Sequence, residues 1–63
     1  MKTMYVIQLT IKNQTCYAMD SRGMMTTTAS RYAMRRASAE ALEKVIKFHP
    51  ELKEMGATVT VSQ

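Results

Sequence analysis

AMRRASAEALEKVIKFHPEL, residues 33–52, is the stretch that decides the fold. It is the only segment with a long helical pattern, a start signal and a definite stop. Ser38 is a good helix N-cap, and Glu40 in the first turn suits the helix dipole. Pro50 ends the helix, because proline has no N–H and disfavours the helical conformation of the residue before it. The rest of the chain therefore has to pack on the apolar face of this helix.

The helical pattern between residues 30 and 49 can be read as one helix or as two. One helix would have an apolar stripe made of Met34, Ala37, Ala41, Val45 and Phe48. In the two-part reading, a short helical turn near residues 29–36 precedes a helix that starts at Ser38. Its buried face would comprise Ala41, Leu42, Val45 and Ile46. We favour the two-part reading. In either reading Pro50 can begin one more turn, over residues 50–55, which Gly56 closes.

Segments on both sides of the helix have the alternation of β-strands. Residues 3–12 put one apolar set on a single face, because side chains alternate between faces in a strand. That set is Tyr5, Ile7, Leu9 and Ile11. Val6 is an apolar exception on the other face, to be covered by a partner or left exposed. Residues 57–61 predict a last strand, in which Ala57, Val59 and Val61 alternate with threonines.

A turn near Asn13 predicts a hairpin that joins the first strand to a second at residues 15–19, and its register has two alternatives. A shorter loop would point Cys16 and Ala18 toward the core. A longer loop would point Tyr17 and Met19 inward instead. We favour the longer loop, because it buries more apolar area. A shift of one residue in the register would reverse this prediction.

The element order is therefore β-β-α-β, in one α+β domain that covers residues 1–63. We expect a three-stranded, antiparallel-type sheet of order 2-1-3 with the helix on one face. Residues 20–30 form the connector between the second strand and the helix. A core this small rarely supplies more than roughly 3–5 kcal/mol. A homodimer is therefore an open alternative to a monomer.

The basic excess of the chain lies in one place. The net charge is +4, and residues 22–36 hold four arginines and no acid. A cluster of this kind suits phosphate or an acidic protein surface. The candidate partner-binding residues are these arginines and two neighbouring methionines, which adapt to irregular surfaces: Arg22, Arg31, Arg35, Arg36, Met24 and Met25. Arg31 and Arg35 are four residues apart and would share a helix face.

The sequence contains no catalytic or metal-binding signature. His49 has no local nucleophile or acid beside it, and it suits the C-terminal end of a helix. Cys16 lies on a predicted strand and reads as a small buried residue. One cysteine and one histidine far apart predict no metal site, and we expect no cofactor and no enzymatic activity. The lone cysteine indicates a reducing cytoplasm, and no stretch reaches the ~20 apolar residues of a membrane span.

The chain resembles small proteins encoded in phage and prophage genomes. The resemblance rests on MYVIQL at residues 4–9, on the A-x-R-x-A-S-x-E pattern and on the HPEL tail at residues 49–52. The pattern consists of Ala33, Arg35, Ala37, Ser38 and Glu40. One departure is Arg36, where such proteins usually place an aromatic residue. Some of these proteins are similar to non-enzymatic inhibitors, anti-CRISPR proteins among them, that bind a host or defence complex.

The resemblance implies a small accessory protein of a bacterial cytoplasm that binds an acidic host or defence protein through its basic surface. The alternative is a small nucleic-acid-binding module that uses the same four arginines. Aromatic support for nucleic-acid binding is thin, since Tyr32 is the only ring inside the cluster and single-strand binders usually interleave several. Nucleic-acid binding should weaken steeply as the salt concentration rises, whereas binding to a specific protein should survive moderate salt.

Overall fold

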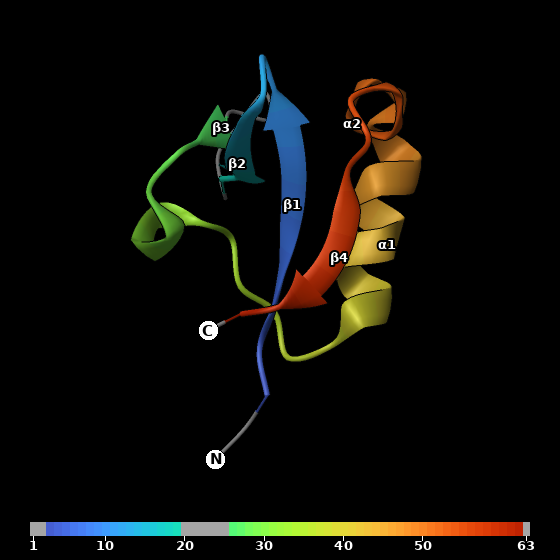
Figure 1. The fold of residues 1–63 in the computed structure, drawn as a ribbon. Helices are drawn as coiled ribbons and strands as arrows, with labels where there is room; N and C mark the ends of the chain where they lie inside the picture. Colours follow the sequence, from blue (N-terminus) through green and yellow to red (C-terminus); the bar gives the residue numbers. More distant parts are fainter. Residues whose placement is uncertain (1–2, 20–25, 63) are drawn as a thin grey trace.

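The computed structural model describes residues 3–19 and 26–62 (Figure 1). It confirms an α+β fold with an antiparallel sheet and helices. The elements are β1 (Tyr5–Ile11), β2 (Gln14–Ala18), β3 (Thr26–Thr27), a 3₁₀ turn η1 (Ser30–Tyr32), α1 (Ala39–Phe48), α2 (Pro50–Glu54) and β4 (Thr58–Val61).

The sheet has four strands in the order β3-β2-β1-β4, so the prediction of three strands is wrong. The three predicted strands are present, and the last one pairs with the first as expected. The additional strand β3 lies inside the predicted connector, where Thr26 and Thr27 pair with the end of β2. Their β-branched side chains favour extended backbone. The two helices lie together on one side of the sheet (Figure 1).

The turn between β1 and β2 overturns the favoured register of the first hairpin. Ile11 faces Gln14, so only Lys12 and Asn13 form the loop. Their φ angles are 51° and 64°, and positive φ at both central residues is the property of a type I′ turn. This turn matches the right-handed twist of the strands. As a result Cys16 and Ala18 are buried, and Tyr17 lies on the opposite face.

Residues 33–36 occupy the space where the start of β1 and the end of β2 diverge. The Met34 N–H donates to the Ala18 carbonyl at 2.9 Å. Tyr5 and Arg36 exchange two backbone hydrogen bonds, of 2.8 and 3.1 Å. This stretch is extended, and the 3₁₀ turn before it ends at Tyr32. The sheet is therefore completed at this end by the chain that leads into α1.

The helical region is divided into two parts as predicted, but the first part is shorter than predicted, because only residues 30–32 are helical and residues 33–36 are not. α1 begins directly after Ser38, whose side chain makes no capping hydrogen bond. Leu42 is fully buried on the face that packs on the sheet, whereas Phe48 is 78% exposed. The single-helix stripe is therefore wrong. The core cluster consists of Ile7, Leu9, Cys16, Ala18, Met34 and Leu42.

α2 starts at Pro50 and is closed by Gly56, as the sequence predicts. The Gly56 N–H donates to the Lys53 carbonyl and the Ala57 N–H donates to the Leu52 carbonyl, both at 3.0 Å. These two bonds form a Schellman motif, whose C′ residue must have positive φ. Gly56 meets this requirement with a φ of 78°. The motif turns the chain from α2 into β4 and keeps Leu52 buried.

We expect Gly56→Ala to lower the free energy of unfolding by about 1 kcal/mol, because a Cβ disfavours the left-handed conformation. A Cβ built at Gly56 meets no atom within 4 Å, so the loss would come from the backbone and not from a clash. Urea unfolding followed by circular dichroism measures the effect. The matched control is Gly56→Asn, which should cost less, since asparagine tolerates this conformation. Equal losses in the two variants would contradict the argument.

Candidate partner-binding surface

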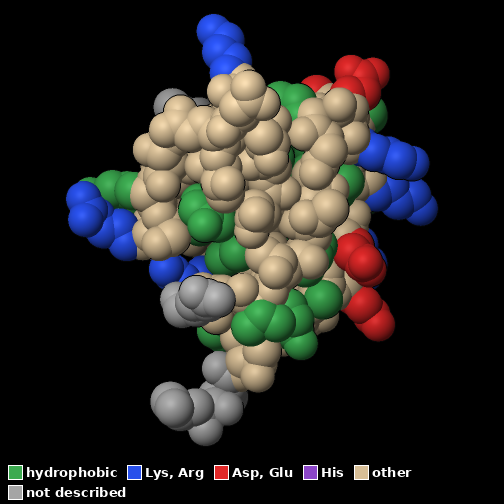
Figure 2. Space-filling view, in the orientation of Figure 1, with side chains coloured by type: hydrophobic (Ala, Val, Ile, Leu, Met, Phe, Trp, Pro, Cys, Tyr) green, Lys and Arg blue, Asp and Glu red, His purple; other side chains and the backbone are tan. Residues whose placement is uncertain are grey.

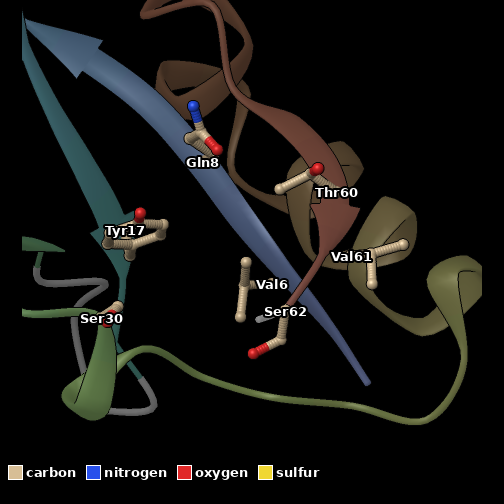
Figure 3. A pocket seen from close by; sticks show the side chains of 7 residues that line it. All are labelled: Val6, Gln8, Tyr17, Ser30, Thr60, Val61 and Ser62. Atoms are coloured by element: carbon tan, nitrogen blue, oxygen red, sulfur yellow. The ribbon is translucent and has the colours of Figure 1, made fainter. Parts of the chain in front are cut away.

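The face of the sheet opposite the helices carries mostly uncharged polar side chains. The register of the strands puts Gln8, Tyr17 and Thr60 on this face, together with Val6. They surround a hollow of about 290 Å³, whose rim also includes Ser30 and Ser62 (Figure 3). We call this the outer face. Its hydroxyl and amide groups offer hydrogen bonds but no charge.

Val6 lies at the centre of the hollow and is only 4% exposed. The sequence left open whether a partner covers it. The chain itself does so, because Ser30, Tyr17 and Ser62 surround Val6 in Figure 3. Val6 therefore belongs to a second, smaller buried site on the outer face, apart from the core cluster beneath the sheet.

Arg35 ties the 3₁₀ turn to the end of the chain. Its Nε donates to the Ser62 hydroxyl at 3.1 Å, and its Nη2 donates to the Ser30 carbonyl at 2.9 Å. A longer bond of 3.4 Å joins Nη1 to the Arg31 carbonyl. Because Met34 points into the core, alternation puts Arg35 on the outer face, beside the hollow. Arg35 is thus engaged by two backbone carbonyls and one serine hydroxyl of the protein itself, and it is not a free contact for a partner.

The predicted helix face shared by Arg31 and Arg35 does not exist, because η1 ends at Tyr32. Arg31 is exposed, and its guanidinium carbon lies 4.9 Å from the centre of the Tyr32 ring. Tyr32 is itself 56% exposed. Arg36 donates to the Arg35 carbonyl at 2.7 Å. Arg31 on its aromatic neighbour is therefore the most accessible cation of residues 30–36, which we call the arginine segment.

Charge is divided between the two sides of the molecule. Residues 3–19 and 26–38 contain Lys12 and three arginines but no acid. Residues 39–55 contain four glutamates and three lysines, all on or next to α1 and α2. Figure 2 shows the acidic side chains along one margin of the molecule and a group of cationic side chains at the opposite margin. The arginine segment thus borders an uncharged sheet face with no acid among the described residues nearby in the sequence.

Three predicted site residues, Arg22, Met24 and Met25, lie outside the described residues. The structure thus places Arg31, Arg35 and Arg36 in one short segment. Sequence reasoning missed the hollow on the outer face. The one signal for it was Val6, an apolar residue out of step with the alternation.

The other chemically active side chains have ordinary surroundings. Cys16 is buried in the core, and its Sγ lies 3.7 Å from the Gln14 carbonyl oxygen. His49 ends α1, and its Nδ1 lies 3.4 Å from a Glu51 carboxylate oxygen on the surface. Within residues 3–19 and 26–62, no three histidine, cysteine or acidic side chains gather as metal ligands. No helix in the described part of the chain is long and apolar enough to span a membrane.

No family model matches this chain, and no match is found among curated proteins or among solved structures. Its function is therefore argued from the geometry of its surfaces.

Proposed function

We propose that the chain is a non-enzymatic binding module that docks on an acidic protein surface through the arginine segment and the adjoining outer face. The observation that carries the proposal is the division of charge: the described residues before α1 have cations and no acid. Complementary charge steers association and excludes partners of the wrong sign. Following the resemblance to phage and prophage proteins, we propose a host or defence protein as the partner.

Arg31 and Tyr32 are the proposed anchor of this interface. Arginine and tyrosine are enriched among residues that dominate binding energy. The guanidinium of Arg31 lies over the Tyr32 ring, and both side chains are exposed to a partner. Uncharged hydroxyl groups beside them would supply hydrogen bonds without the desolvation penalty of buried charges. Arg35 would contribute by positioning the segment and not by contacting the partner.

A protein partner is favoured over nucleic acid because the guanidinium of Arg35 is engaged within the protein and is not open to a phosphate. The Arg35 donors already bind Ser30, Arg31 and Ser62. Tyr17 is the only aromatic side chain on the outer face within the described strands. Nucleic-acid binding is the alternative that the experiment below distinguishes.

The test is affinity capture from nuclease-treated bacterial lysate at low and high salt, followed by titration of the captured protein after purification. We expect Arg31→Glu to weaken that interaction by at least tenfold, about 1.4 kcal/mol. The matched control is Lys44→Glu, which makes the same charge change on exposed α1, away from the outer face. It should bind like the native protein.

Two outcomes would overturn the proposal. Equal capture by native protein and by both variants would show that the arginine segment is a solvated surface. The other is binding to a single-stranded oligonucleotide with a steep dependence on salt. If the logarithm of the association constant fell by about 0.7 per log unit of salt for each phosphate contact, the segment would be assigned to nucleic acid instead.

A further inference from the structure

A second hollow lies on the helix side of the sheet, and we call it the groove. It lies between β4 and the two helices and has a volume of about 520 Å³. Its apolar lining comes from Ile46, Ala57 and Val59, and its charged rim from Glu43, Lys47 and Lys53. No residue of the arginine segment lines it. Figure 1 shows β4 beside α1 at the margin of the sheet.

The free edge of β4 forms one wall of this groove. The Ser62 N–H donates to the Met4 carbonyl at 2.7 Å. Since bonded pairs alternate along an antiparallel ladder, Thr60 and Thr58 also bond toward β1. The N–H and C=O groups of Val59 and Val61 therefore point away from β1. In the described part of the chain, β4 is the end strand of the sheet, so no strand pairs with these groups.

We propose that the β4 edge receives an extended, acidic peptide segment of another protein as an additional strand. Main-chain bonds to Val59 and Val61 would provide the affinity, and alternate side chains would enter the groove, as in other cases of strand addition. There they would cover Ile46 and Val59, which are only half-buried. A carboxylate among them would meet Lys47 and Lys53.

Charge selects this occupant over a second copy of the chain. The groove has two lysines against one glutamate. A second copy pairing through β4 would present Thr58–Val61, which contains no acid, and of its own groove residues only Glu43 could meet these lysines. An acidic peptide supplies both the strand and the charge. The groove shares no lining residue with the arginine segment, so the inference stands independently of the proposed function.

The probe is a fluorescein-labelled peptide with threonine at odd positions and valine and glutamate in turn at even positions. We expect saturable binding, and slower amide hydrogen exchange at Val59 and Val61 in the complex. The Lys47→Gln, Lys53→Gln double variant should bind about tenfold more weakly, since each exposed ion pair contributes up to about 1 kcal/mol. Lys44→Gln, outside the groove, should bind normally.

A peptide of the same sequence with N-methylated backbone tests the strand itself, because it cannot form the ladder. It should not bind. Binding that survives N-methylation, or the absence of binding by the unmodified peptide, would overturn the proposal. So would slow exchange at Val59 and Val61 in the free protein that depends on protein concentration, which would show that a second copy occupies the edge.

Discussion

Leu42→Ala is expected to leave the protein largely unfolded at room temperature. Leu42 is fully buried and joins α1 to the core beneath the sheet. Truncating a buried leucine to alanine costs about 2–5 kcal/mol, because the transfer free energy is lost and a cavity remains. A core of this size supplies roughly 3–5 kcal/mol in total. The loss is therefore comparable to the whole stability of the domain.

Urea unfolding followed by far-ultraviolet circular dichroism measures this effect. The matched control is Phe48→Ala on the same helix, which removes a larger side chain that is 78% exposed. It should change the unfolding midpoint little, since alanine also favours the helix. If both variants lost the same stability, α1 would not pack on the sheet through Leu42.

Arg35→Met should lower the free energy of unfolding by about 1–2 kcal/mol, because it removes three charge-assisted hydrogen bonds that are partly exposed to water. Methionine keeps the length of the apolar stem, so the change isolates the guanidinium. The variant should also lose structure locally, around the hollow on the outer face. Without the bonds to Ser30 and Ser62, the hollow should open and expose Val6. Nuclear magnetic resonance would then detect faster amide exchange in residues 60–62.

The control is Arg31→Met, which removes an exposed guanidinium stacked on Tyr32. It should cost at most about 0.5–1 kcal/mol and leave exchange near Ser62 unchanged. Unchanged exchange in Arg35→Met would contradict the structural role of Arg35. This role also limits binding experiments, because reversing all the arginines together would damage the fold and the surface at once. A substitution of Arg31 alone changes the binding surface without damaging the fold.

The two strand registers show where sequence reasoning reached its limit. Alternation in residues 3–12 predicted that Ile7 and Leu9 face the core, and both are buried. For β2, burial area favoured Tyr17 over Cys16, and that prediction was wrong. The turn at Lys12 and Asn13 decided the register, because its positive φ angles suit the twist of the hairpin. The small side chains of Cys16 and Ala18 then fit beneath Met34 and Leu42 in the core.

The candidate sites depended even more on tertiary contacts. The sequence identified a basic segment, but composition cannot show that Arg35 bonds to a serine 27 residues away. Nor can it show that residues 33–36 lie between β1 and β2. The groove beside β4 arises from α1, α2 and β4 together, and no local pattern predicts a surface built from three elements.

The sequence by itself determined the α+β class, the start of α1 after Ser38, the break at Pro50 and the closure at Gly56. These features depend on local backbone preferences and on the period of apolar residues. Both can be recognised within a few neighbouring positions of the sequence. Only the tertiary structure decided the hairpin register, the fourth strand, the burial of Val6 and the role of Arg35. Each of these depends on which distant groups meet, and the free energies that separate the alternatives belong to contacts between segments and not to any segment alone.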